Sequence, residues 1–145
     1  MDTGFFQCWF RGFEEGLVEM DNEARSRLLE CCAKRCADTG VLQAHLRHYQ
    51  AVNGSRDDYY NRLSEIGNVR GEILVPGREY AICFPDCACD LHTACGVSTP
   101  LLCECSRQSI RYVAETVWKG CRVRVVTEDT VFSGAPECRF RLIFQ

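Results

Sequence analysis

Cysteine thiols are the side chains in this sequence with the greatest capacity for chemistry. Twelve of the 145 residues are cysteine, and six of these fall within a short segment of the second half. The six are Cys83, Cys87, Cys89, Cys95, Cys103 and Cys105. Two Cys-x-Cys pairs in the segment, Cys87/Cys89 and Cys103/Cys105, are suited to zinc, which takes four thiolates at about 2.3 Å. Burial or disulfide pairing of the same thiols is the alternative.

A third cysteine pair lies in the first half. Cys32 and Cys36 are four residues apart on a predicted helix, so both thiols share one face and could bind the same ion. They could equally be small buried side chains that pack this helix on a sheet. The predicted metal ligands are therefore Cys32, Cys36, Cys87, Cys89, Cys103 and Cys105, with zinc as the ion. Core packing is expected of Cys8, Cys31, Cys121 and Cys138, and no role is assigned to Cys83 and Cys95.

Nucleophilic catalysis would require a base beside a thiolate. His92 is near the cysteine-rich segment, but spacing alone proves no geometry, and a solvated loop histidine is the expectation. His45 and His48 share a helix without a ligand or catalytic signature, and Glu104 is expected to face solvent more often than to act as a ligand or base. The sequence contains no glycine-rich phosphate loop, nucleophile elbow or His-Glu zinc motif. No catalytic residue is assigned.

Composition narrows the class of protein. Hydrophobic residues make up 46% and charged residues 26%, which is typical of a folded globular domain, and the length predicts a single domain over residues 1–145. A net charge of -3 offers no broad cationic surface for nucleic acid. Residues 1–20 carry several charges and show no signal peptide, and no apolar stretch is long enough to cross a membrane. We expect a soluble cytoplasmic protein, in which thiols serve metal binding or redox chemistry more often than structural disulfides.

Hydrophobic spacing predicts helices in the first half. Asp21 is the expected N-cap of a helix that ends at Gly40, with Ala24, Leu28, Cys32 and Cys36 on one face. Further helices are expected over residues 41–52 and 57–66.

The second half changes to strand periodicity. Residues 71–75 and 79–84 flank a turn-prone Pro-Gly and predict a β-hairpin. A helix capped by Ser106 and ended by Gly120 follows, and residues 121–127 and 138–144 then predict an antiparallel hairpin. The expected fold is α+β, with N-terminal helices packed on an antiparallel sheet and a helix before the C-terminal hairpin.

Four short motifs occur in order along the chain. They are Cys32-x-x-x-Cys36-Ala37, Cys87-x-Cys89, Leu102-Cys103-x-Cys105-Ser106 and Ser133-Gly134-x-x-x-Cys138-Arg139-Phe140-Arg141-Leu142. This order resembles small bacterial proteins related to L-2-amino-thiazoline-4-carboxylate hydrolase, and the last motif also resembles the end of 4-vinyl-reductase-type ligand-binding domains. The resemblance implies helices covering an antiparallel sheet, a small-molecule pocket between the layers, and in the vinyl-reductase-type relatives a cysteine-bound zinc.

Three functions are consistent with these residues. The first is an intracellular domain that binds a small molecule, with a cysteine-held zinc shaping its pocket. The alternative is a hydrolase of a cyclic amide or thiazoline-like substrate, acting through a cysteine thiolate or a metal-bound water. The third is a disulfide-bearing or redox-active protein. We expect the binding domain, with a small-molecule ligand, a homodimer as the assembly, and neither nucleic acid nor membrane as partner.

Overall fold

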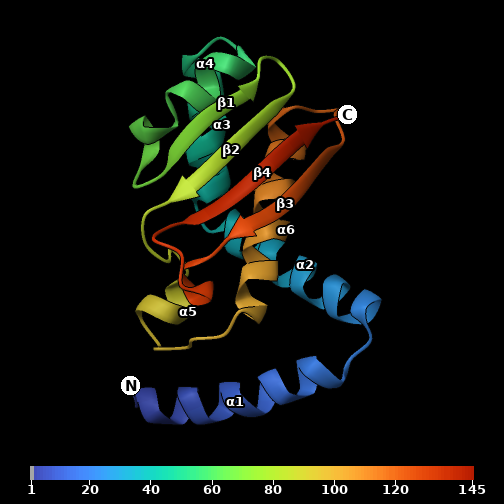
Figure 1. The fold of residues 1–145 in the computed structure, drawn as a ribbon, viewed down its shortest axis with the longest axis vertical. Helices are drawn as coiled ribbons and strands as arrows, with labels where there is room; N and C mark the ends of the chain where they lie inside the picture. The colour runs from blue at the N-terminus through green and yellow to red at the C-terminus, as the bar shows by residue number, and fades with distance from the viewer. Residues whose placement is uncertain (1) are drawn as a thin grey trace.

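Residues 2–145 of the computed structural model form an α+β fold in which helices cover one face of a four-stranded antiparallel sheet (Figure 1). The elements in chain order are α1 (Thr3–Glu19), α2 (Asn22–Asp38), α3 (Val41–Ala51), α4 (Arg56–Asn61), the 3-10 helix η1 (Leu63–Ile66), β1 (Arg70–Val75), β2 (Glu79–Phe84), α5 (Asp90–Thr93), α6 (Leu101–Val117), β3 (Val123–Asp129), the 3-10 helix η2 (Val131–Ser133) and β4 (Cys138–Phe144). The predicted fold class is confirmed.

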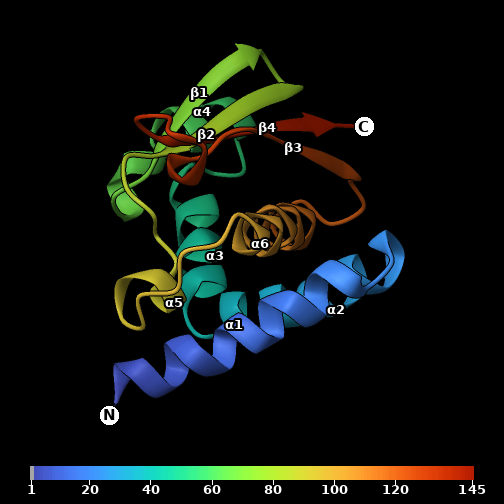
Figure 2. The same ribbon diagram turned by 60° about the horizontal axis from the view of Figure 1, so that its bottom comes forward.

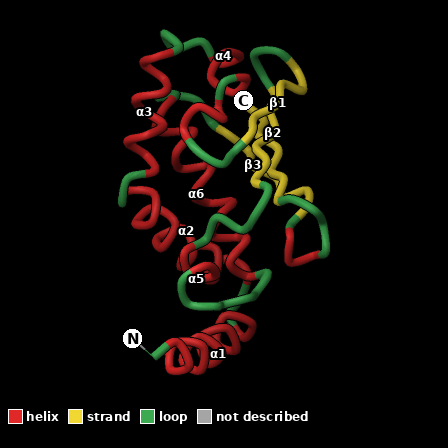
Figure 3. The backbone as a smooth tube through the Cα atoms, turned by 90° about the vertical axis from the view of Figure 1, so that its left-hand side faces the viewer, coloured by secondary structure: helices red, strands yellow, loops and turns green. Residues whose placement is uncertain are grey.

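The sheet combines the two predicted hairpins. Its strand order is β1-β2-β4-β3, so that β2 and β4 form the centre and β1 and β3 form the edges. Ile82 of β2 stands opposite Phe140 of β4, and Tyr80 stands opposite Leu142. Helices α2, α3 and α6 all lie on the side to which these residues point, while residues 2–145 form no covering layer on the other side of the sheet (Figures 2 and 3).

Helix ends follow local capping chemistry, with one difference that affects the site. The Asp21 side chain accepts a hydrogen bond from the Ala24 amide at 2.8 Å, which confirms the predicted N-cap of α2. Helix α6 begins at Leu101 after Pro100 and not at Ser106, because proline needs no amide partner at a helix start. The Ser106 hydroxyl instead donates to the Leu102 carbonyl at 3.5 Å within the helix. Cys103 and Cys105 therefore lie on the first turns of α6.

The predicted helix over residues 57–66 is divided. Helix α4 ends at Asn61, Arg62 interrupts the α-helical conformation, and η1 continues to Ile66. The division lets α4 pack directly on β1, where Gly71 passes so close to the Tyr60 carbonyl that an added Cβ atom would overlap it. Tyr60 stacks on Tyr80 with ring centroids 4.2 Å apart, and this contact anchors the core at this end of the sheet.

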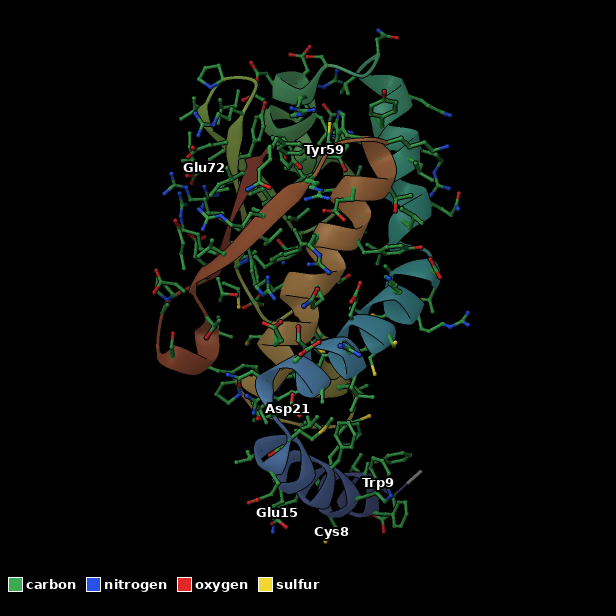
Figure 4. The ribbon with its side chains drawn as sticks, turned by 90° about the vertical axis from the view of Figure 1, so that its right-hand side faces the viewer. Cys8, Trp9, Glu15, Asp21, Tyr59 and Glu72 are labelled. Carbon is green, nitrogen blue, oxygen red and sulfur yellow. The ribbon has the colours of Figure 1, made fainter. Side chains whose placement is uncertain are left out.

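Helix α1 stands largely apart from the rest of the fold, at the bottom of Figure 1. Leu17 is its only buried residue among those described, and Phe5 and Trp9 are 63% and 57% exposed. Its aromatic rings pack mainly on each other, as in the Trp9–Phe13 stack at 5.7 Å, and Cys8 lies on the side away from the body (Figure 4). None of the helices formed by residues 2–145 is long and apolar enough to span a membrane.

The uncovered face of the sheet carries alternating charges. Arg139 of β4 binds Glu72 of β1 at 2.9 Å and Glu128 of β3 at 2.8 Å, so one guanidinium links three strands. Arg141 pairs with Glu79 of β2 in the next outward row. Glu72 is seen in Figure 4 on the side of the sheet opposite the helices. Side chains of opposite charge thus form ion pairs across this solvent-exposed face of the sheet.

Candidate ligand-binding cavity

A cavity of about 210 Å³ lies between the inner face of the sheet and helices α3 and α6. Strand alternation places Ile82, Phe140 and Leu142 on its sheet side. Ile110 and Val113 of α6 lie opposite, three residues apart on one helix face. These two walls of the cavity are therefore formed by the central strands β2 and β4 and by helix α6.

Six cysteines from four parts of the chain line this cavity. They are Cys36 of α2, Cys87 and Cys89 between β2 and α5, Cys103 and Cys105 of α6, and Cys138 of β4. Five of the six predicted metal ligands are in this group, and Cys32 is not. The structure therefore brings thiols that are far apart in the sequence to one cavity at the junction of helices and sheet.

The position of Cys36 corrects the predicted face of α2. The buried residues of this helix are Leu29, Ala33 and Ala37, one position further along than the predicted Leu28, Cys32 and Cys36. A shift of one residue turns a helix face by about 100°. Cys32 and Cys36 are consequently exposed and are not core residues, although Cys36 still reaches the cavity from its rim.

The four cysteines expected in the core divide into three groups. Cys138 is 7% exposed and faces inward from β4, as strand alternation predicted. Cys121 is only partly buried, because β3 begins two residues later at Val123. Cys8 and Cys31 are exposed, so the prediction of burial was wrong for both. Cys8 belongs to the poorly packed α1, and Cys31 lies on the outer side of α2.

Burial raises the pKa of several of the cavity thiols. Loss of solvent raises the pKa of Cys103 to about 11 and that of Cys105 to about 12. Neighbouring sulfur atoms add to the effect, since Cys138 raises the pKa of Cys103 and Cys36 raises that of Cys105. The pKa of Cys87 is raised by burial as well. At neutral pH these groups are thiols, which are poor nucleophiles and must lose a proton to bind a metal.

The donor chemistry of the cavity suits zinc, but the arrangement of the side chains does not yet form a metal centre. Thiolates are preferred zinc ligands, and the four thiols of the two Cys-x-Cys pairs would supply a complete tetrahedral set. Within residues 2–145, however, no three Cys, His, Asp or Glu side chains are grouped closely enough to hold an ion. Zinc binding therefore stays a prediction.

The wall formed by α3 and α4 carries a histidine–tyrosine pair that sequence reasoning missed. Nδ1 of His45 is hydrogen-bonded to the hydroxyl of Tyr59, and both residues line the cavity. Nε2 of His48 bonds the Tyr59 carbonyl at 2.9 Å and holds the tyrosine backbone in place. Burial lowers the pKa of His45 to about 4, so its imidazole is neutral at physiological pH. The one signal in the sequence was the spacing of four between Val41 and His45, which puts both on one helix face.

Two other candidate residues lie outside the cavity wall. Nδ1 of His92 bonds the Val97 carbonyl at 2.9 Å, and the imidazole packs edge-on against Phe132 at 5.1 Å. Glu104 is held by Arg107 at 2.6 Å. The described residues that line the cavity include no Lys, Arg, Asp or Glu, and His92 is not among them. A Cys–His catalytic pair with His92 is therefore not formed by the cavity residues.

Neither a scan of protein-family models nor a search of curated proteins yields a match for this chain.

Proposed function

We propose that this protein is a small-molecule-binding domain whose ligand occupies the cavity between α3, α6 and the sheet. The observation that carries the proposal is a cavity with apolar walls, six thiols along its lining and no Lys, Arg, Asp or Glu among the described lining residues. Apolar concave sites with a few polar groups are the usual form of ligand sites in proteins. A volume of about 210 Å³ is enough for a ligand of on the order of ten non-hydrogen atoms.

The protonation of the cavity thiols and the hydrogen bonding of the cavity histidine favour ligand binding over hydrolysis as the function. A cysteine nucleophile needs a thiolate and a base in reach. Burial raises the pKa of Cys103 and Cys105 to about 11 and about 12, and the one histidine in the cavity wall bonds Tyr59 instead of a thiol. The hydrolase that the family resemblance implies thus has no activated nucleophile among these thiols.

Cysteine-bound zinc belongs to the proposal as a second, separable component. Elemental analysis of protein purified under reducing conditions tests it, and a stoichiometry near one ion per chain is the expected result. Chelation should then lower the free energy of unfolding, because metal binding is coupled to folding. Protein that contains no zinc and is unaffected by chelator would remove the metal from the proposal and leave the cavity unchanged.

The binding proposal is tested by filling the cavity. Ala114 of α6 is 3% exposed and lines the cavity, so Ala114→Phe occupies part of the space. Ala51→Phe, at the exposed end of α3, adds the same side chain away from it. Naphthalene is a suitable probe, with binding followed by ligand-observed NMR.

We expect wild-type protein and Ala51→Phe to bind naphthalene equally, and Ala114→Phe to bind it at least about tenfold more weakly. Circular dichroism of all three proteins checks that each is folded. Equal binding by wild-type protein and folded Ala114→Phe, or absence of binding by wild-type protein, would contradict the proposal.

A further inference from the structure

We infer that the cavity selects an uncharged ligand that carries a carbonyl-type hydrogen-bond acceptor, and that His45 is the residue that recognises this acceptor. The inference rests on the proposed function and specifies the chemical class of the ligand. It follows from the absence of charge in the cavity lining and from the hydrogen bonding of His45 and Tyr59.

The absence of charge excludes ionic ligands. The described lining contains no Lys, Arg, Asp or Glu side chain that could form an ion pair with a carboxylate, a phosphate or an ammonium group. Glu104, which lies between the lining thiols Cys103 and Cys105 in the sequence, is engaged by Arg107 and accepts a further hydrogen bond from Gln108 at 3.0 Å. Moving an ion from water into such a site costs several kcal/mol when no partner compensates it. An uncharged isostere of the same shape escapes this cost.

The position of the proton on His45 follows from the needs of Tyr59. Tyr59 is 1% exposed, and its ring is fixed by an edge-to-face contact with Trp118 at 4.5 Å. Its hydroxyl has one hydrogen-bond partner in the part of the chain that the structure describes, which is Nδ1 of His45. A buried hydroxyl that fails to donate is costly, so the tyrosine O–H donates and Nδ1 accepts.

A neutral imidazole has a single N–H, and with Nδ1 accepting, that proton is on Nε2. Nε2 of His45 makes no hydrogen bond to any other group within residues 2–145. The cavity wall therefore offers one N–H donor from a ring held in place at its other nitrogen. A ketone, ester or amide carbonyl satisfies this donor, whereas an ammonium group, which only donates, does not.

Three probes of similar shape separate the parts of this inference. The probes are 2-naphthamide, 2-naphthoate and naphthalene: the first two differ in charge, and naphthalene lacks the acceptor. We expect wild-type protein to bind the amide about tenfold more tightly than naphthalene, and the carboxylate at least about tenfold more weakly than the amide. His45→Phe should lower the ratio of amide affinity to naphthalene affinity from about ten to about one. His92→Phe, a histidine outside the cavity wall, is the matched control.

A spectroscopic readout on wild-type protein does not depend on the folding of any variant. Long-range ¹H–¹⁵N correlation spectra of the histidine rings distinguish the two neutral tautomers, and His45 should carry its proton on Nε2. Tyr59→Phe removes the hydroxyl and should shift the tautomer population while weakening only the amide.

The outcomes separate this inference from the proposed function. Naphthoate binding as tightly as naphthamide, equal loss of amide and naphthalene binding in folded His45→Phe, or a proton on Nδ1 would overturn the inference and leave the binding function standing. Failure of all three probes to bind wild-type protein would instead remove the proposed function and the inference together.

Discussion

The two faces of the sheet differ completely in charge, although the same strands supply both. In β4, Phe140 and Leu142 face the cavity, whereas Arg139 and Arg141 alternate with them on the uncovered side. The outer guanidinium groups of Arg139 and Arg141 pair with carboxylates of the neighbouring strands, whereas the described residues that line the cavity include no Lys, Arg, Asp or Glu. The period of two along a strand is thus what keeps charge out of the cavity. The following four predictions test this contrast between the faces.

The largest change in the free energy of unfolding is expected when a side chain on the inner face of the sheet is shortened. Leu142 is fully buried on the cavity wall, and Leu142→Ala should lower the free energy of unfolding by about 3 kcal/mol through lost contacts and added void. Its outward neighbour gives the comparison, since Arg141→Ala should cost less than about 1 kcal/mol. Urea denaturation measures both. A loss for Arg141→Ala as large as that for Leu142→Ala would mean that the outer ion pairs, and not the inner face, dominate stability.

The next prediction concerns how the free energy of unfolding depends on the protonation of His45, the histidine among the described cavity-lining residues. The pKa of His45 is about 4 when folded and 6.5 in an unfolded chain, so the unfolded state takes up a proton first as pH falls. Stability should therefore decrease as pH falls from about 6.5 towards 4, by at most about 3 kcal/mol from this group. His45→Phe should flatten this part of the curve of unfolding free energy against pH. Parallel curves for the two proteins would show that the cavity wall tolerates a charged imidazole.

A smaller effect is expected on the outer face. Arg139→Met removes the guanidinium that links Glu72 and Glu128, while retaining much of the aliphatic side chain. The expected loss of unfolding free energy is about 1 kcal/mol at low salt, and it should shrink as salt screens the pairs. Denaturation curves at low and high ionic strength measure it. A loss that does not change with salt would indicate that packing of the arginine side chain, and not its charge, stabilises the strands.

The last prediction leaves the fold unchanged and compares thiols. Cys8 and Cys31 are exposed, whereas Cys103 and Cys105 are partly buried with raised pKa values. Near neutral pH, iodoacetamide should modify the first pair at least about tenfold faster than the second, because the thiolate is the reactive form. Peptide mass spectrometry over a time course gives each rate. Rapid modification of Cys105 in folded protein would show that its thiol is ionised, and would revive the hydrolytic alternative.

Local signals in the sequence predicted the elements well, because caps and hydrophobic periods act over a few residues. The Asp21 cap, both hairpins and the helix before the second hairpin are present. Features that depend on distant partners were not predictable in the same way. The pairing of β2 with β4 joins residues more than fifty positions apart in the sequence, and Pro100 extends α6 back over Cys103 and Cys105.

The candidate site was predicted in part. The Cys-x-Cys thiols line one cavity, but no three Cys, His, Asp or Glu side chains of residues 2–145 are grouped closely enough to hold an ion. The role of His45 depends on Tyr59, fourteen positions later, and on the burial of both. The burial of Leu29 instead of Leu28 reflects packing against α6, which the α2 sequence does not contain. Zinc, a homodimer and a cytoplasmic location stay predictions.

The isolation of α1 also determines what the two tryptophans of the chain can report. Trp9 lies on that helix in contact with solvent, and Trp118 is 8% exposed among the core aromatics. The intrinsic emission of the protein is thus a sum of one surface and one interior fluorophore. Replacing the indole of Trp9 leaves a single probe beside the Tyr59 ring, through which occupancy of the neighbouring cavity becomes visible without an added dye.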